Sequence, residues 1–150
     1  MRLLHLLHQY LPRHVGGVEL NTHHLVRQQR AAGHAVALFY PDAGPSEAPP
    51  APRVDEEGMV HFAASVEPAS ATARFAATFR HPALATAFEA ALDEWQPDVV
   101  HVQHMMGLPA TAFDLLAERN IPFLVTLHDY WWRCANAQLL TNDTQQLCGG

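Results

Sequence analysis

Short apolar runs alternate with helical stripes of apolar residues along most of this chain. A continuous apolar run at 35–40 is typical of a strand that is buried on both faces of a sheet, and the segment 98–103 is also predicted to be a strand. Shorter runs predict further strands at 2–8, 59–63 and 122–127. Strands that alternate with helices predict an α/β fold, in which helices cover both faces of a mostly parallel sheet.

Helical periodicity is clearest in the segment that ends at Pro97. Its apolar residues recur on one face of a helix, namely Leu84, Phe88, Ala91, Leu92 and Trp95. Two further helices are predicted at 17–32 and 108–120. The Ala-rich segment 65–79 is ambiguous, and we expect a loop with some helix there.

Residues 42–58 are predicted to form a flexible loop. Four prolines oppose regular structure there: Pro45, Pro49, Pro50 and Pro52. The loop would begin just after the second strand, so Tyr40 and Asp42 are expected at the end of that strand.

Composition narrows the class of protein. A chain of 150 residues is long enough for one domain, 1–150, with a substantial core. A formal net charge of -6 with only 9 Lys and Arg argues against nucleic acid as a partner. No apolar run approaches the length of a membrane span, and His5, His8 and Gln9 interrupt the N-terminal stretch. We therefore expect a cytoplasmic protein, and the polar end at Gly149–Gly150 suggests a fragment of a longer chain.

Gly16 and Gly17 stand between the first predicted strand and the first predicted helix. Glycine lets a ligand approach the main chain, and the first N–H groups of a helix have no partners within it. Such a turn is a ready site for an anion such as a phosphate. Gly-Gly turns are also common without any ligand.

Polar and aromatic residues follow several of the predicted strands, and the ends of parallel strands meet at one edge of a sheet. His104 follows the strand at 98–103, and His128 and Asp129 follow the strand at 122–127, before Tyr130 and Trp131. A histidine beside an aspartate can exchange protons near neutral pH. The alternative is that hydrogen bonds fix His128 and that it has no chemical task. The aromatic rings of Tyr130, Trp131 and Trp132 suit stacking on a sugar, although Trp132 is expected to pack in the core.

Other histidines are expected to be ordinary. His5 and His101 lie within predicted strands and are interpreted as hydrogen-bonded core residues, whereas His23 and His24 are expected to be solvated. His101 and His104 would point to opposite faces of a strand, which makes a poor chelate.

Neither a metal nor a cofactor is predicted. Cys134 and Cys148 offer only two thiolates, whereas a closed zinc site needs four ligands. A dinucleotide is not favoured either, because the loop at 14–19 lacks the G-x-G-x-x-G fingerprint.

Three segments resemble family 4 glycosyltransferases: Gly-Gly-Val-Glu at 16–19 with Gly-His-Ala-Val at 33–36, Pro-Asp-Val-Val-His at 97–101, and Thr-Leu-His-Asp at 126–129. The resemblance implies the N-terminal, acceptor-side half of a GT-B fold, with a Rossmann-like sheet. It implies transfer of a sugar from a nucleotide-activated donor to an acceptor, with retention of configuration and without a bound metal. Gly16 and Gly17 would approach the donor phosphates, and His128 would be the active-site histidine that contacts the donor sugar. Substrate contacts are also expected from Glu19, His104, Asp129, Tyr130 and Trp131.

The chain also departs from that family. Gln29 stands where the first helix usually carries an apolar residue, and the acidic E-x7-E motif of the donor-binding half is absent, so this chain alone should be inactive. Cys134 and Cys148 resemble a cysteine-bearing extension in part of the family. A non-catalytic sugar- or nucleotide-binding module and a sugar-nucleotide epimerase remain as alternatives, and the protein could lie against the inner face of a membrane.

Overall fold

The computed structural model describes residues 1–43, 51–66, 70–134, 137–141 and 143–147. Its centre is a six-stranded sheet with the strand order β3-β4-β2-β1-β5-β6. Neighbouring strands run parallel throughout, except that β3 is antiparallel to β4. The strands are β1 (Arg2–Leu6), β2 (Ala35–Ala43), β3 (Arg53–Val54), β4 (Val60–Val66), β5 (Val99–Val102) and β6 (Phe123–Val125). The predicted mostly parallel sheet is confirmed.

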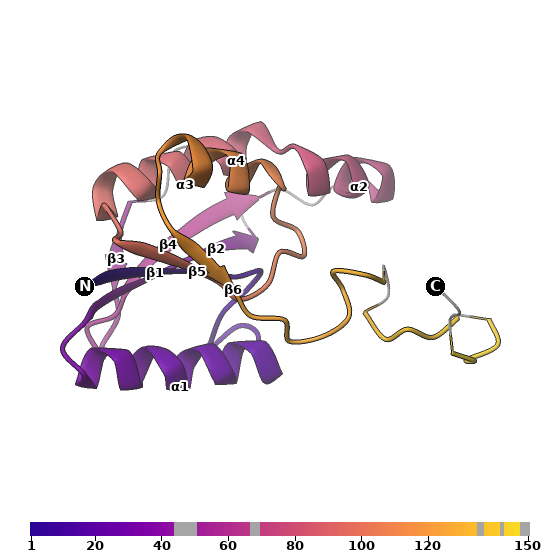
Figure 1. Cartoon of the computed structure of the whole chain (residues 1–150), viewed down its shortest axis with the longest axis horizontal. Helices are drawn as coiled ribbons and strands as arrows, with labels where there is room; N and C mark the ends of the chain where they lie inside the picture. Colours follow the sequence, from indigo (N-terminus) through magenta and orange to yellow (C-terminus); the bar gives the residue numbers. More distant parts are fainter. Residues whose placement is uncertain (44–50, 67–69, 135–136, 142, 148–150) are drawn as a thin grey trace.

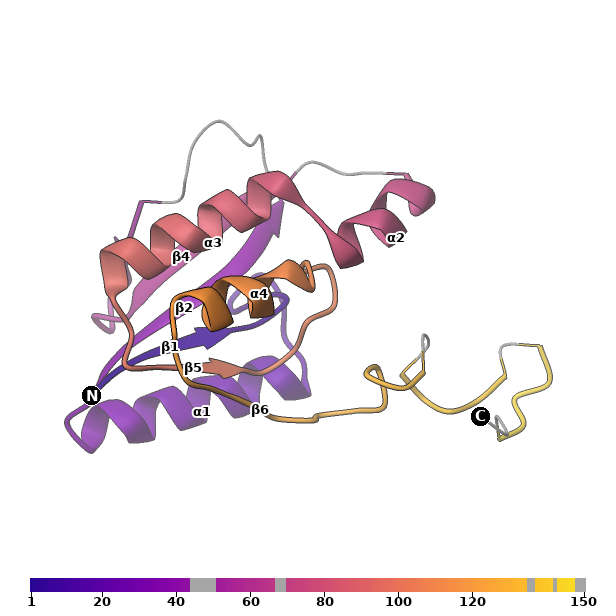
Figure 2. The same cartoon turned by 45° about the horizontal axis from the view of Figure 1, so that its top comes forward.

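Helices cover both faces of this sheet. Helix α1 (Gly17–Ala31) lies on one face, and α2 (Ala71–Phe79), α3 (Pro82–Trp95) and α4 (Thr111–Glu118) lie on the other side (Figure 1). Figure 2 shows α3 and α4 next to each other over the strands, with α2 beyond the end of α3. Pro82 at the start of α3 and a left-handed Gln96 at its end fix the limits of that helix.

The order of the strands creates a switch point between β1 and β5. From β1 the chain passes through α1 to β2 on one side, and later it returns through α3 to β5 on the other side of β1. Connections on opposite sides leave a crevice at the carboxyl ends of the two central strands. The fold therefore defines where a ligand can bind before any side chain is considered.

The two faces of the sheet bury different kinds of side chains. Under α3 and α4 the core is apolar, with Phe39, Phe62 and Phe88 fully buried. Under α1 an apolar cluster around Val26 adjoins buried polar side chains, which are His5, Glu19, Thr22 and Gln103. Buried polar groups need partners, so the α1 face depends on specific hydrogen bonds.

The prediction of a loop at 42–58 is wrong at both ends of that segment. Strand β2 extends to Ala43 and pairs with β4 along its length, so Tyr40 and Asp42 lie within the strand rather than after it. Strand β3 lies in the second half of the predicted loop, and a turn at Asp55–Met59 joins it to β4. Residues 44–50 lie outside the described residues.

Two other segments also differ from the prediction. Within 65–79, β4 continues to Val66 and α2 is a regular helix whose N-terminus is capped by the Ser70 hydroxyl. Strand β1 ends at Leu6, two residues earlier than predicted, so His8 lies in the loop after it. None of the helices in the described part of the chain is long and apolar enough to cross a membrane.

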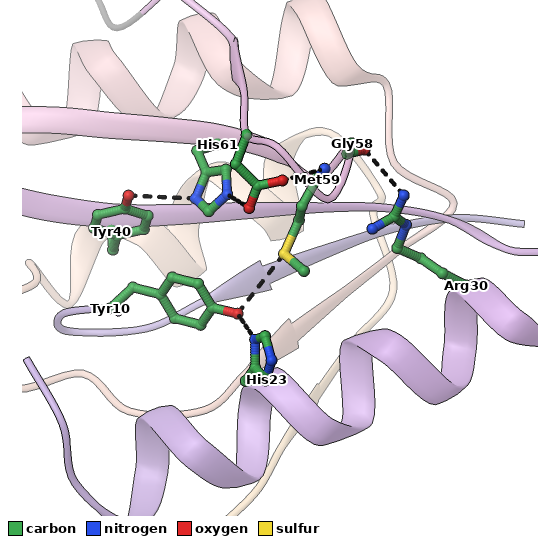
Figure 3. A network of polar contacts seen from close by, with 8 residues as sticks. Tyr10, His23, Arg30, Tyr40, Gly58, Met59 and His61 are labelled. Carbon is green, nitrogen blue, oxygen red and sulfur yellow. Dashed lines mark hydrogen bonds and ion pairs between the residues drawn. The ribbon is translucent and has the colours of Figure 1, made fainter. Parts of the chain in front are cut away.

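A buried polar contact ties the loop after β1 to α1 (Figure 3). The Tyr10 hydroxyl hydrogen-bonds with His23 Nδ1 at 3.0 Å and lies 3.7 Å from the Met59 sulfur. His23 is therefore half-buried and bonded, so the prediction that it is solvated is wrong, whereas His24 is exposed as expected. Burial is the main cause that raises the pKa of Tyr10, which keeps its hydroxyl protonated.

A second polar contact holds the β3–β4 hairpin. The Tyr40 hydroxyl donates to His61 Nδ1 at 3.3 Å, and His61 Nε2 donates to Asp55 Oδ2 at 2.9 Å. The other Asp55 oxygen accepts from the Met59 backbone N–H at 2.8 Å. These bonds hold the short turn at Asp55–Met59, which lies in the segment that was predicted to be a flexible loop from its prolines.

We expect His23→Ala to lower the free energy of unfolding by about 1 kcal/mol, because the buried Tyr10 hydroxyl loses its partner. His24→Ala, at the neighbouring exposed position, should change it by less than about 0.5 kcal/mol. Urea unfolding of both variants measures the difference. Equal effects of the two substitutions would show that the Tyr10 contact does not stabilise α1.

Candidate functional site

Three histidines lie at the carboxyl ends of three adjacent strands, β1, β5 and β6. His8 follows β1, His104 follows β5 and His128 follows β6. The rings of His8 and His104 lie 4.6 Å apart, centroid to centroid. The predicted convergence of strand ends at this edge is thus present in the structure, at the switch point between β1 and β5.

The N-terminus of α1 borders the histidines. Gly16 is the N-cap residue and Gly17 the first residue of the helix. Glu19, in the first turn, is 2% exposed, and its Oε1 lies 3.4 Å from His8 Nε2. A Cβ at position 16 would lie 2.5 Å from Glu19 Oε2, whereas a Cβ at position 17 would meet nothing within 4 Å. The two glycines therefore differ: Gly16 leaves room for Glu19, and Gly17 leaves the helix terminus uncovered.

His104 is held in one tautomer. Its Nδ1 accepts from the Met106 backbone N–H at 3.1 Å, so its Nε2 carries the proton and donates to Asp129 Oδ2 at 3.2 Å. The other Asp129 oxygen accepts from the Trp131 backbone N–H at 2.9 Å. Burial raises the pKa of Asp129, but the Trp131 N–H and His104 lower it more, so the net shift is downward. A carboxylate thus stands at the rim of the site.

His128 is half-buried, and its Nε2 lies 2.8 Å from Gln103 Oε1. The pKa of His128 is lowered, first by burial and then by the nearby His104, while Asp129 and Glu19 act in the opposite direction. A lowered pKa means that His128 is neutral near pH 7 and has one N–H and one lone pair.

His8 and Glu19 each have a buried polar atom without a hydrogen bond, although Glu19 Oε1 lies 3.4 Å from His8 Nε2. Burial, followed by the repulsion that a protonated His104 would exert, lowers the pKa of His8 from 6.5 to about 4. Within the described residues, His8 Nδ1 and Glu19 Oε1 are buried without a hydrogen bond. Such atoms are rare in folded proteins, and a water molecule or a ligand can supply the missing partner.

The aromatic residues after β6 are arranged differently from the prediction. Trp131, rather than Trp132, packs against the core, with its ring 5.5 Å from the His104 ring, whereas Trp132 is 37% exposed. Tyr130 is 57% exposed, and no hydrogen bond or ring contact in the described part of the chain joins it to the histidines. Both tryptophans line an apolar hollow of about 120 Å³ together with Phe79 and Phe113.

A larger cavity of about 280 Å³ opens beside the loop after β1, on the α1 side of the sheet. Its wall combines aromatic, basic and acidic side chains, among them Tyr10, Arg13, His14, Tyr40, Asp42 and Arg53. Arg13 pairs with Asp42 at 2.7 Å. His8, His104 and His128 are not among the residues that line this cavity.

No metal centre emerges from the described residues, where no group of three or more His, Cys, Asp or Glu is arranged to hold an ion. Cys148 lies outside the described residues, so the structure does not test the role expected for the two cysteines.

Sequence reasoning missed two members of the site, His8 and Gln103. His8 was assigned to the first strand, which is two residues shorter than predicted. Gln103 was assigned to the fifth strand, but it follows β5 and is fully buried. Both are polar residues at the end of an apolar run, and that pattern could have indicated that they follow the strand and belong to the site.

The chain matches the model of Glycosyltransferase Family 4 over residues 15–145. It belongs to that family, as an N-terminal domain with an α/β fold of the GT-B type. No curated protein matches the chain in sequence at a significant level.

Among solved structures, the chain is similar to sucrose-phosphate synthase from Thermosynechococcus elongatus, with 14% sequence identity and a TM-score of 0.57. The match covers 97% of this chain and 38% of that chain. At this identity the likeness establishes the fold alone. The chain thus spans well under half the length of the enzyme that it resembles.

The two glycines provide a matched test of the site. We expect Gly16→Ala to destabilise the chain by about 1–3 kcal/mol, because the new methyl group would overlap the Glu19 carboxylate. Gly17→Ala should leave stability unchanged or raise it by up to about 1 kcal/mol, since alanine favours the helix. Thermal and urea unfolding measure both.

A double variant identifies the cause. In Glu19→Ala, the carboxylate that Gly16 accommodates is gone, so adding Gly16→Ala should have a much smaller effect than in the wild-type chain. A coupling of about 1 kcal/mol or more between the two positions supports the contact. Additive effects would contradict it.

Stability should also depend on pH through the buried histidines. The pKa values of His5 and His8 are lowered from 6.5 to about 4, mainly by burial. Between these values the unfolded chain binds protons that the folded chain does not, so the free energy of unfolding falls as pH drops from 6.5 to about 4.

Urea midpoints measured between pH 7 and 4 would show this slope. His8→Gln should flatten it in part, and His24→Gln, at an exposed position, is the matched control. Stability that stays constant or rises as pH drops through this window would refute the assignment of neutral, buried histidines.

Proposed function

We propose that this chain is the acceptor-side half of an enzyme that transfers a sugar, of the hexose type, from a nucleotide-activated donor with retention of configuration. The observation that carries the proposal is the meeting of an uncovered helix N-terminus with a neutral histidine, His128, at one switch point of the sheet. In this proposal a second, donor-binding domain closes over the site, and the chain alone does not catalyse transfer. Neither a metal nor another cofactor takes part.

The donor diphosphate would lie at the start of α1. The first-turn N–H groups point out of the helix and carry the positive end of its dipole, and Gly17 leaves them open to approach. The buried Glu19 carboxylate would repel the phosphates if they came close. We therefore assign Glu19 to a hydroxyl of the substrate, which would donate to its Oε1, an atom without a hydrogen bond in the described residues.

His128 would contact the donor sugar, since its second ring nitrogen, Nδ1, makes no hydrogen bond with the described residues. The His104–Asp129 pair would form the adjoining wall, with the remaining acceptor capacity of Asp129 available to a sugar hydroxyl. Tyr130 and Trp131 would complete the contacts at the rim.

The acceptor would occupy the cavity of about 280 Å³ beside Tyr10 and Tyr40. Its wall offers aromatic faces together with the paired charges of Arg13 and Asp42, which suit a ligand that carries several hydroxyl groups. Because the loop after β1 carries both His8 and the cavity residues Tyr10 to His14, an acceptor placed there would lie on the same loop as the histidine site.

We expect His128→Ala, in the protein that joins this chain to its donor-binding domain, to lower kcat for sugar transfer by about 100-fold or more. The reason is that a group contacting the reacting sugar acts on the transition state. Stability should fall by only about 1 kcal/mol, from the lost bond to Gln103. Product analysis by mass spectrometry and NMR measures transfer, retention and any epimerisation of the donor.

His24→Ala is the matched control, because His24 is an exposed histidine on α1. It should leave kcat and stability unchanged. Normal transfer by a folded His128→Ala variant would reject the role of His128. A wild-type protein that binds nucleotide sugars without transferring them would favour a binding module, and an epimerised donor would favour an epimerase.

A further inference from the structure

A row of three hydrogen bonds runs from α1, through the sheet, to the candidate active site. Gln29 Oε1 on α1 lies 2.8 Å from His5 Nε2 on β1. His5 Nδ1 lies 3.0 Å from Gln103 Nε2, just after β5. Gln103 Oε1 lies 2.8 Å from His128 Nε2. Four side chains from four segments of the chain thus form one continuous series.

The middle of the series is sealed from water. His5 and Gln103 have no exposed surface, so neither can exchange its partner for solvent. Burial lowers the pKa of His5 to about 4, which leaves its ring neutral with a single N–H. A neutral ring between two amides must donate to one of them and accept from the other.

The arrangement of the amide atoms gives the series one direction. His128 Nε2–H donates to Gln103 Oε1, the Gln103 amide N–H donates to His5 Nδ1, and His5 Nε2–H donates to Gln29 Oε1. The reverse direction requires both amides to turn over together and moves the proton of each histidine to its other nitrogen. The tautomers of His5 and His128 are therefore coupled.

We propose that Gln29, His5 and Gln103 are positioning residues that keep the proton of His128 on Nε2. The Nδ1 lone pair is then available to accept a hydrogen bond from a ligand hydroxyl in the crevice. That this hydroxyl belongs to a donor sugar rests on the proposed function, whereas the tautomer does not depend on it.

Other groups around His128 do not determine its tautomer. The charged or titratable groups that act on it are His104 after β5, Asp129 beside it and Glu19 on α1, and His128 in turn acts on His101 of β5. Each has a hydrogen bond or ion pair elsewhere: His104 with Asp129, Glu19 with His8, and His101 with Thr126. They influence how readily His128 gains a second proton, while Gln103 decides which nitrogen holds the first.

Gln29 provides the most informative substitution, because three hydrogen bonds separate it from His128 and it does not contact that ring directly. In Gln29→Leu, His5 Nε2–H would lose its acceptor. A buried N–H without a partner is less tolerable than a buried lone pair without one, so His5 should move its proton to Nδ1. Gln103 would then turn over and donate to His128 Nε2, which shifts the proton of His128 to Nδ1.

The experiment records long-range ¹H–¹⁵N spectra of the histidine rings in the ligand-free, ¹⁵N-labelled chain near pH 7.5. In the wild type we expect His128 as a single Nε2–H tautomer. Gln29→Leu should shift His128 toward Nδ1–H, and Gln103→Leu should produce a mixture of the two tautomers. Gln29→Glu, which keeps an acceptor for His5, should retain the wild-type tautomer.

Gln28→Leu is the matched control, since it makes the same change at the neighbouring exposed position of α1 and should leave the His128 tautomer unaltered. A wild-type His128 that carries its proton on Nδ1, or a folded Gln29→Leu variant with an unchanged His128 spectrum, would overturn the proposal. The spectra contain no substrate, so a lack of sugar transfer would reject the proposed function without affecting this result.

A pH titration of His128 extends the test to Gln103. In Gln103→Glu the new carboxylate would accept from His128 Nε2–H and should raise the pKa of His128 by about one to three units. An unchanged pKa in this folded variant would show that residue 103 does not hold the ring and would overturn the proposal.

Discussion

The contact between His5 and Gln103 is the interaction on which the rest of this structure depends. Both side chains are fully buried at the centre of the sheet, where an unpaired polar group would be costly. Beside this mutual hydrogen bond, the other ring nitrogen of His5 reaches Gln29 on α1, and the amide oxygen of Gln103 reaches His128 after β6. The position of the helix, the pairing of β1 with β5 and the orientation of the site histidine are thus linked by one set of bonds.

The two faces of the sheet are held together by different kinds of contact. Under α3 and α4 the core is apolar, and Phe39 and Phe88 pack there without hydrogen bonds between side chains. Under α1 the histidines are buried in neutral form, with lowered pKa values for His5 and His8. Neutral rings with fixed tautomers can present lone pairs and N–H groups at defined places, which a ligand with hydroxyl groups requires.

The sequence predicted the parallel sheet, the helices on both faces and the edge where the site lies, because apolar runs and helical stripes record burial directly. It did not predict β3, whose two residues are held by side-chain hydrogen bonds of Asp55 with His61 and Met59 rather than by an apolar pattern. Nor did it reveal Gln103 as the partner of His128. Pairing between polar side chains far apart in the chain leaves no periodic signal, whereas the glycines and His128 stand in recognisable motifs.

The central claim is that the switch point between β1 and β5 binds the sugar donor, with His128 in contact with the sugar. The most direct measurement is a crystal structure of the two-domain protein with a nucleotide-sugar donor bound. We expect His128 Nδ1 within about 3 Å of a hydroxyl of the donor sugar and the first-turn N–H groups of α1 directed at the diphosphate. A donor bound elsewhere, such as in the cavity beside Tyr10 and Tyr40 and away from His128, would contradict the account.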